Sequence, residues 1–589
     1  MGKYYVDNII GNDNNTGNKE FPWKTIQKAA DTAVAGDTVI VNSGIYRESV
    51  TIKDSGNERD TIVYAAEGEV VISGANILSD HSSEGWTNKG DGVWCFKYPE
   101  ILPFGWNVLD HHVSTNASMF HVSRREMVII DGKVCGTVAY QPDLMPWMIY
   151  AAGNTCPDLG PLVNPTIFVH FPEGKSPGNS LIEYGTSRHQ LYIEASYITI
   201  DGFTFRHYAG GYHMHGVSIN GSNNIFRNTI CEWSNYDGFA LSGSNHYVEN
   251  VETRDNGCIG HWIISAEYCT FRNIKTIRNN WKGYNFFCEA GAAKIAFSHH
   301  CVFDRIYAAD NDGIGYWLDG WNFHNTISNS MAINNKYAGF MLEMFTEYTK
   351  MFNNISCYNR GMGLYISNAV GNVIVHNTIF RNEEQGLNIW RDSERSTRGG
   401  RNLIYNNIFA NNGKHEIRVL FDDTDNANFD YADLFSNKLD GNIYWKSCSN
   451  TPFGLFGTLV DFFETNEIEA WRAKWVEPDH IIKRCDDYDA NSLCSNPKLE
   501  NTSTEHGWRI SEDSPARGFG VIIPSYTIDE IFEKKFIIRE REEFKTYIKE
   551  MLVKNNDLLN MNHYLYVCKD CLGTKRPDIR PDTGAFQYE

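Results

Sequence analysis

Short apolar runs follow a series of glycines through the middle of the chain. These glycines lie 22 to 24 residues apart, with one interval of 32, at positions 216, 238, 260, 283, 315, 339, 363 and 386. The third residue after each glycine is apolar, and this column comprises Ile219, Leu241, Ile263, Phe286, Leu318, Leu342, Ile366 and Ile389. Alternation along a strand sends the second and fourth residues of each run to the opposite face. The pattern predicts stacked short strands that bury one face.

A second run in each period is marked by asparagine, at Asn228, Asn250, Asn273, Asn329, Asn354 and Asn377. Such a column suggests asparagine ladders stacked at turns. β-Branched and aromatic runs separated by Gly and Asn favour strands, because a helix needs apolar positions at intervals of about 3.6 residues. The pattern of leucine-rich repeats is missing. We therefore predict an all-β protein, a parallel β-helix (solenoid) with about three short strands in each coil.

The repeat divides the chain into four regions. Residues 1–76 hold an N-terminal cap, with the helix-like "TIQKAADTA" (Thr25–Ala33), and the first coils. Residues 77–192 lose the period and contain runs such as "GVWCFKY" and "TIFVHF", which favour an inserted β-sandwich-like domain of antiparallel strands. Residues 193–420 form the central coils. Residues 421–589 form the C-terminal end with peripheral loops and short helices, one of them in the charged run Thr527–Lys554.

Composition and charge exclude several classes of partner. The chain is 42% hydrophobic and 13% aromatic, as expected of a folded protein with a large core. With 53 basic and 73 acidic residues, its net charge of −20 disfavours nucleic acid, anionic membranes and polyanionic substrates, so a neutral partner fits better. The N-terminus lacks the pattern of a signal peptide and no run approaches the ~20 apolar residues of a membrane span, so we expect a cytoplasmic protein.

The cysteines and histidines give no strong sign of a metal or cofactor. Cys568 and Cys571 form one CxxC without a second pair, which is weak evidence for zinc or redox chemistry. Four histidines, at positions 213, 215, 299 and 300, lack the acidic partners or the helical spacing of a metal site, and hydrogen-bonded structural histidines explain them better. We expect no cofactor, and the sequence is compatible with a monomer or a homo-oligomer.

Two carboxylates share one position of the repeat. Asp319, in "GYWLDG", is the fourth residue after Gly315, and Glu343 is the fourth after Gly339. Neighbouring coils pair ~4.8 Å apart, so the two groups should lie side by side on the outer face. Opposed like charges destabilise a sheet. Carboxyl groups ~5–5.5 Å apart suit a retaining glycosidase, whereas an inverting enzyme needs ~6.5–9.5 Å, and one of two close carboxyls is readily kept protonated as an acid.

The residues around this pair fit a sugar site. Trp317 and Tyr365 share the adjacent outward column, and Trp390 lies in the column of the carboxylates, where exposed aromatic rings could stack on sugars. The 32-residue interval adds about eight residues in Phe287–His300, and this longer loop should form one wall of a cleft where Glu289 accepts hydrogen bonds from sugar hydroxyls. The alternative is that these carboxylates are ordinary solvated charges.

The chain resembles a known superfamily. The run "PWKTIQKAADTAVAGDTVIVNSGIYRE", the Asn-marked coils and the terminal "DTGAFQYE" look like the pectate-lyase-type right-handed β-helix superfamily. The inserted β-domain, with "YWLDG" followed 24 residues later by "FMLEM", resembles glycoside hydrolase family 120, the β-xylosidases. The resemblance covers nearly the whole chain and implies an exo-acting, retaining enzyme that releases xylose from short, neutral xylo-oligosaccharides.

The resemblance also implies roles for single residues. It places the nucleophile at Asp319, the acid/base at Glu343 and an acid that binds the non-reducing sugar at Glu289. The family's usual His before that last residue is Cys288 here, a departure that affects the sugar subsite. The inserted domain is expected to contribute an aromatic to the leaving-group site, for which Trp106 is the candidate.

Three other functions are alternatives at this stage. A polysaccharide lyase of this fold would need a Lys, Arg or His base, and no basic residue occupies the outward positions of the coils that begin at Gly315 and Gly339. An inverting hydrolase of the polygalacturonase kind would carry "NTD" and "GHG" motifs, which are missing. A non-catalytic glycan-binding solenoid would make Asp319 and Glu343 incidental.

Overall fold

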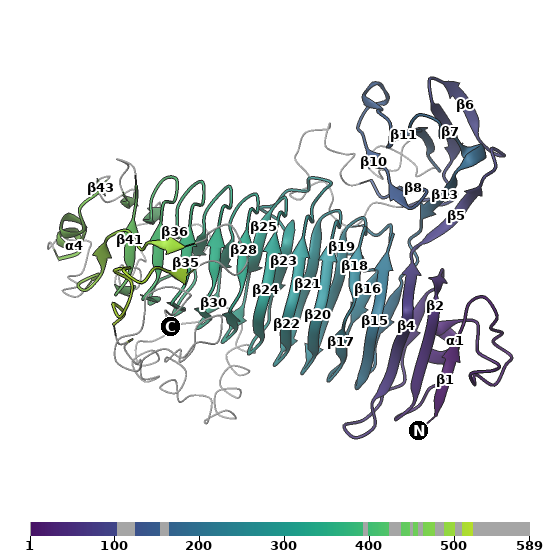
Figure 1. The fold of residues 1–589 in the computed structure, drawn as a ribbon, viewed down its shortest axis with the longest axis horizontal. Coiled ribbons are helices and arrows are strands. Elements are labelled where there is room, and N and C mark those ends of the chain that lie inside the picture. Colours follow the sequence, from purple (N-terminus) through teal and green to yellow (C-terminus); the bar gives the residue numbers. More distant parts are fainter. Residues whose placement is uncertain are drawn as a thin grey trace.

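The protein is a parallel β-helix that carries an inserted domain near its N-terminal end (Figure 1). This computed structural model describes residues 2–102, 124–152, 164–211, 213–392, 399–422, 437–447, 452–457, 463–476, 488–500, 509–521 and 523. Trp106, the Cys568 and Cys571 pair, and the charged run 527–554 lie outside the described residues. Among the described helices, no segment is both long and apolar enough to span a membrane.

Two long sheets form the wall of the solenoid. The 13-stranded sheet carries one strand per coil, and its strands are β3 (Val50–Ile52), β14 (Leu191–Ile193), β16 (Val217–Ile219), β19 (Asp237–Ser244), β21 (Ile259–Glu267), β23 (Gly291–Ala296), β25 (Ile314–Leu318), β29 (Phe340–Glu343), β33 (Leu364–Ser367), β36 (Leu387–Asp392), β39 (Ile417–Asp422), β42 (Phe453–Gly457) and β43 (Phe463–Thr465). All its pairings are parallel except that of β42 with β43.

The 20-stranded sheet supplies two strands to many coils. Its strands are β1 (Lys3–Val6), β2 (Thr38–Tyr46), β4 (Ile62–Ser73), β15 (Ile198–Arg206), β17 (Ile225–Arg227), β18 (Ile230–Glu232), β20 (Tyr247–Arg254), β22 (Thr270–Ile277), β24 (Val302–Ala309), β27 (Thr326–Ser328), β28 (Met331–Ile333), β31 (Lys350–Phe352), β32 (Ile355–Cys357), β34 (Val373–Val375), β35 (Thr378–Phe380), β37 (Leu403–Tyr405), β38 (Ile408–Ala410), β40 (Lys438–Asp440), β41 (Ile443–Trp445) and β44 (Leu493–Cys494). The predicted fold of about three short strands per coil is confirmed.

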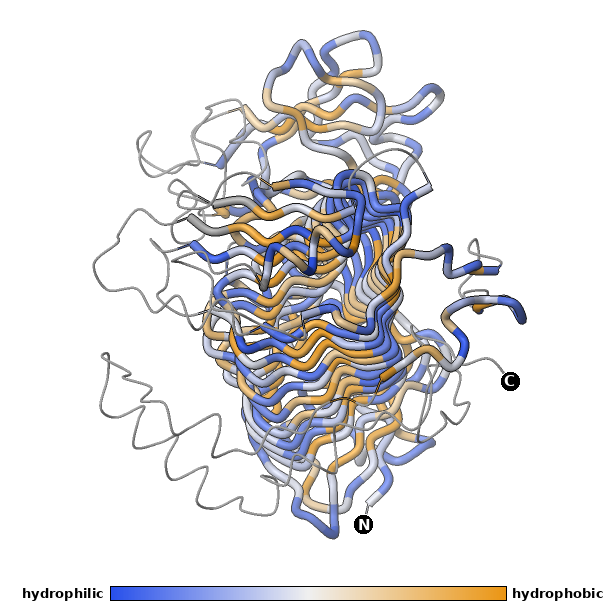
Figure 2. The backbone as a smooth tube through the Cα atoms, turned by 90° about the vertical axis from the view of Figure 1, so that its left-hand side faces the viewer, coloured by the Kyte–Doolittle hydropathy of each residue, from blue (hydrophilic) through white to orange (hydrophobic). Residues whose placement is uncertain are grey.

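Apolar residues stack in register inside the solenoid. Figure 2 shows hydrophobic segments of successive coils aligned above one another. Tyr316 and Leu318 of β25 are fully buried in this core, as the alternation in "GYWLDG" predicted. The first coil is closed by the short helix α1 (Ile26–Ala30), whose first two N–H groups donate to the carboxylate of Glu48. A second helix, α4 (Ile468–Val476), packs Trp471 onto the core near the other end.

The inserted domain lies between two adjacent coils of the solenoid, and the strands on either side of it still pair. β4 pairs in parallel with β15, although the insertion separates them in sequence. One of its sheets has five strands, β6 (Thr87–Gly90), β7 (Val93–Lys97), β10 (Gly136–Thr137), β11 (Met148–Ala152) and β12 (Thr166–His170). The other has four, β5 (Ala75–Asp80), β8 (Val128–Ile130), β9 (Lys133–Val134) and β13 (Leu181–Gly185). Most strands are antiparallel and the two sheets share one apolar core, as predicted for a β-sandwich-like insertion.

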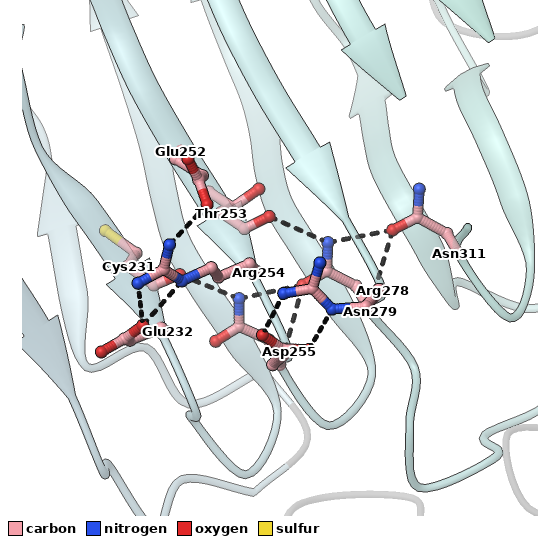
Figure 3. Close-up of polar contacts among 10 residues, drawn as sticks. Cys231, Glu232, Glu252, Thr253, Arg254, Asp255, Arg278, Asn279 and Asn311 are labelled. Carbon is pink, nitrogen blue, oxygen red and sulfur yellow. Dashed lines mark hydrogen bonds and ion pairs between the residues drawn. The ribbon is translucent and has the colours of Figure 1, made fainter. Parts of the chain in front are cut away.

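Asparagine ladders connect successive turns, but not in the single column that the sequence suggested. Asn228, Asn250 and Asn273 form one ladder by side-chain hydrogen bonds of 3.1 Å. Asn354 and Asn377 belong to a different, buried ladder. A further buried ladder, which the sequence analysis missed, joins Asn256, Asn279, Asn311, Asn335, Asn359, Asn382 and Asn412. Figure 3 shows Asn279 next to Asn311, beside the ion pairs Arg254–Glu232 and Arg278–Asp255.

Candidate active site

Asp319 and Glu343 lie at equivalent positions of neighbouring coils. The register pairs Tyr316 with Phe340 and Leu318 with Leu342, so the next residue on each coil is a carboxylate. Asp319 directly follows β25 and its amide donates to the carbonyl of Ile295, while the chain turns at Gly320, where φ is +63°. Glu343 ends β29, pairs with Ser367 and is 2% exposed. The register predicted for these two coils is therefore confirmed.

Lys294, on the preceding coil, contacts Asp319. It pairs in register with Trp317, and its Nζ lies 2.9 Å from Oδ2 of Asp319. The same nitrogen lies 4.0 Å from the ring centroid of Trp317 and donates to the carbonyl of Cys288 at 2.6 Å. This site therefore contains a cation that the sequence analysis did not assign.

The missed lysine follows from an error in the predicted repeat. Gly283 and Phe286 were assigned to the repeating glycine and core columns, but Ala292 and Ile295 occupy those positions, since Ile295 pairs with Leu318. The extra residues of the long interval precede the strand β23. Gly283 misled the assignment because it marks a turn of its own, with φ of +80°.

Glu289 lies in this extra segment and is not a solvated loop residue. It is 6% exposed, and its Oε1 lies 3.0 Å from Nε2 of His213. The hydroxyl of Tyr236 donates to its Oε2. Burial raises the pKa of Glu289, but the hydrogen bond and charge of His213, the charge of Lys294 and the Tyr236 bond outweigh it and leave the pKa below its usual value. Glu289 is thus held as a buried, hydrogen-bonded carboxylate.

A second imidazole–carboxylate pair adjoins the first. Nδ1 of His215 bonds Oδ2 of Asp237, which is completely buried. Burial lowers the pKa of His215, but the charge and hydrogen bond of Asp237, with the charge of Glu289, raise it overall. The other oxygen of Asp237 is buried and accepts no hydrogen bond from the described part of the chain. The sequence analysis noted both histidines but did not identify their acidic partners, which lie 22 and 76 residues away.

The outward aromatics are more buried than predicted. Trp317 and Tyr365 are each 3% exposed and pack in one apolar cluster with Met341 and Met362, so the expectation of exposed sugar platforms is wrong for both. Trp390 is half-buried and stacks on Tyr365, with ring centroids 6.2 Å apart. The rings lose exposure because neighbouring coils stack them against each other.

Two buried indoles nevertheless keep unused hydrogen-bond donors. Trp262 precedes Lys294 in the same outward column, and Trp317 follows it. The Nε1–H groups of both have no acceptor in the described part of the chain. Buried donors of this kind cost free energy unless a partner satisfies them.

The described residues contain no group of three or more His, Cys, Asp and Glu side chains arranged to hold a metal ion. His299, one of the four histidines noted in the sequence, lies 3.0 Å from Oε1 of Glu267.

The candidate site brings together Asp319, Lys294 and Glu289, with Glu343 on the next coil. It offers carboxylates suited to nucleophilic and acid–base chemistry.

Comparisons with known proteins agree with the fold. The family described as periplasmic copper-binding protein (NosD) matches residues 275–445, and a family described as protein of unknown function (DUF1565) matches residues 9–53. The uncharacterized protein YwoF of Bacillus subtilis is 38% identical over 80 residues, which are 13% of this chain and 17% of that protein. The chain thus matches about one sixth of the length of this relative.

Among solved structures, the complex of XylC with xylose has a TM-score of 0.58 and 20% identity, covering 78% of this chain and 86% of that one. A structure described as a glycoside hydrolase has a TM-score of 0.40 and 12% identity, covering 78% and 97%. The likeness to XylC concerns the fold. The chain has a right-handed parallel β-helix fold.

Proposed function

We propose that the protein is a retaining exo-glycosidase, a β-xylosidase that releases xylose from the non-reducing end of short xylo-oligosaccharides. The observation that carries this proposal is the placement of Asp319 and Glu343 at one position of two adjacent coils. Backbones of adjacent strands lie ~4.8 Å apart, close to the ~5–5.5 Å between carboxyl groups in retaining glycosidases.

The proposed reaction has two displacements. In the first, a carboxylate oxygen of Asp319 bonds to the anomeric carbon, the glycosidic C–O bond breaks, and Glu343 gives its proton to the leaving oxygen. In the second, Glu343 takes a proton from water, whose oxygen bonds to the anomeric carbon as the ester bond to Asp319 breaks. The products are the free sugar and the regenerated pair of carboxyl groups, without any co-reactant other than water.

The remaining contacts support a sugar substrate. Glu289, held by His213 and Tyr236, offers a buried acceptor for sugar hydroxyls. The net charge of −20 favours a neutral oligosaccharide over a uronate polymer. Xylose is the first sugar to test, both from the family resemblance and because the structure of XylC was solved with it.

Hydrolysis of nitrophenyl β-xyloside and xylobiose by the wild type, Asp319→Ala and Glu343→Ala tests the proposal. We expect Asp319→Ala to lose activity and Glu343→Ala to retain only a small fraction of it, and NMR of the first wild-type product should show the β-anomer, as retention requires. Asp312→Ala is the matched control, because Asp312 makes a partly exposed ion pair with Lys336 at 2.7 Å. Full turnover by both site variants would refute the assignment.

A polysaccharide lyase is the second candidate, and one observation favours it. The sequence analysis found no basic residue in the outward positions of the coils that begin at Gly315 and Gly339, but Lys294 occupies an outward position of the coil before them. A lyase could use such a base. The same assays with a uronate polysaccharide separate the two functions, since a lyase releases unsaturated products that absorb ultraviolet light and a glycosidase does not. A solenoid that only binds glycans would give neither product.

A further inference from the structure

We propose that Lys294 is a positioning residue of this site, which fixes the carboxylate of Asp319 by one oxygen and leaves the other oxygen directed to the substrate. This inference rests on the proposed role of Asp319 as the nucleophile. Neither the repeat pattern nor the family resemblance assigned Lys294 a role.

The two oxygens of Asp319 have different surroundings. Oδ2 lies 2.9 Å from the ammonium nitrogen of Lys294. Oδ1 accepts no hydrogen bond from the described part of the chain, while the Asp319 side chain keeps 20% of its surface exposed. A carboxylate held at one oxygen can rotate little, so its second oxygen keeps a defined direction of attack.

Lys294 is itself held on three sides. Its Nζ donates to the carbonyl of Cys288 at 2.6 Å and lies 4.0 Å and 5.6 Å from the ring centroids of Trp317 and Trp262. Its side chain is 10% exposed. An ammonium group between two aromatic rings is attracted to their faces, and a desolvated position strengthens that attraction. These contacts distinguish it from a surface lysine, whose ion pairs contribute little.

The same lysine connects the nucleophile to the sugar-binding loop. Cys288, whose carbonyl it bonds, directly precedes Glu289. Burial raises the pKa of Glu289, and the charge of Lys294 is one of the contributions that outweigh burial. The ammonium also opposes the mutual repulsion of carboxylates on neighbouring coils, which would otherwise destabilise the sheet. Removal of Lys294 should therefore disturb Asp319 first and the loop second.

The test compares Lys294→Met, which keeps the length of the side chain without the charge, with Lys294→Arg, which keeps the charge. Lys414→Met is the matched control, because Lys414 makes an exposed ion pair with Glu384 at 2.8 Å, far along the solenoid from Asp319. For each variant, kcat and KM are measured with nitrophenyl β-xyloside, and the melting temperature reports folding.

We expect Lys294→Met to lower kcat by about 10- to 100-fold, the scale of a misplaced reacting group, with a smaller change in KM. Lys294→Arg should restore part of kcat, and Lys414→Met should match the wild type. A Lys294→Met variant with the wild-type kcat would overturn this inference alone. Equal losses in the Met and Arg variants, together with a large fall in melting temperature, would also overturn it, because they indicate a purely structural lysine. A wild type that hydrolyses no glycoside would overturn the proposed function as well.

Discussion

Nε2 of His213 lies 3.0 Å from Oε1 of Glu289, and this contact joins the turn before β16 to the segment before β23. The two residues are 76 positions apart, so three coils of the solenoid contribute to one polar cluster together with Tyr236. The imidazole keeps about 45% of its side-chain surface exposed, whereas the carboxylate is buried. His213 therefore lies between solvent and the proposed sugar acceptor.

His213→Ala should shift the pH dependence of activity. Burial raises the pKa of Glu289, and His213 supplies the leading contributions that outweigh it. Without His213 the pKa of Glu289 should rise, and the neutral carboxyl group is a poorer acceptor for sugar hydroxyls. We expect KM for xylobiose to increase and the acidic limb of the kcat/KM profile to move to higher pH. The control is His81→Ala, since His81 is exposed beside Asp80. An unchanged acidic limb would contradict this assignment.

The strand pattern was predictable because the spacing of the central coils is regular. From Gly315 to Gly386 the apolar column matches the observed register at Leu318, Leu342, Ile366 and Ile389. Alternation then placed Asp319 and Glu343 correctly with respect to each other. The inserted domain was recognisable because its antiparallel runs interrupt this period.

The surroundings of the carboxylates were less predictable, for two physical reasons. Gly283 lies in a turn but has the spacing of the repeating glycines, so Lys294 was assigned to a loop although it lies on β23. Outward residues of a solenoid can also be buried by their own neighbours along the stack, as Trp317 and Tyr365 are. Because Ile295 pairs with Leu318, Ala292 takes the position of the repeating glycine in this coil, and a search for regularly spaced glycines does not find the strand.

Azide should distinguish the roles of the two carboxylates. If Glu343 is the acid/base, Glu343→Ala still forms the glycosyl ester from an activated nitrophenyl xyloside, but water reacts slowly with it because no base takes its proton. We expect a fall of roughly 10²–10⁴-fold in turnover, the usual contribution of general acid–base catalysis. Azide needs no such base, so it should restore turnover and yield the β-xylosyl azide. Asp319→Ala should not give this product, and rescue of that variant with retention would reverse the two assignments.

The buried asparagine ladder should contribute strongly to stability. Asn335 is completely buried, accepts hydrogen bonds from Asn311 and donates to Ala308 and Asn359. Asn335→Ala leaves several buried groups without partners, each at a cost of about 1–3 kcal/mol. The free energy of unfolding, measured with urea, should therefore fall by the sum of these costs.

The control for this ladder is Asn250→Gly, in the ladder of Asn228, Asn250 and Asn273. Asn250 is exposed and has φ of +53°, a conformation that glycine adopts without strain. We expect a change below about 1 kcal/mol, because water replaces the lost side-chain bonds. Equal losses in both variants would mean that burial of the ladder does not determine its contribution.

A buried histidine in the core should make the fold sensitive to acid. His261 is completely buried, stacks on Phe239 at 5.1 Å and bonds the hydroxyl of Tyr316 beneath the site. Burial lowers its pKa from 6.5 to about 3. Between these values the unfolded chain binds a proton that the folded state does not, so the contribution of His261 to stability is complete above pH 6.5 and falls as the pH decreases, by about 1.4 kcal/mol per unit. His261→Phe removes this proton-binding group and should flatten the dependence of melting temperature on pH between 7 and 4, whereas His81→Ala should not. Parallel curves for His261→Phe and the wild type would show that His261 does not contribute to acid unfolding.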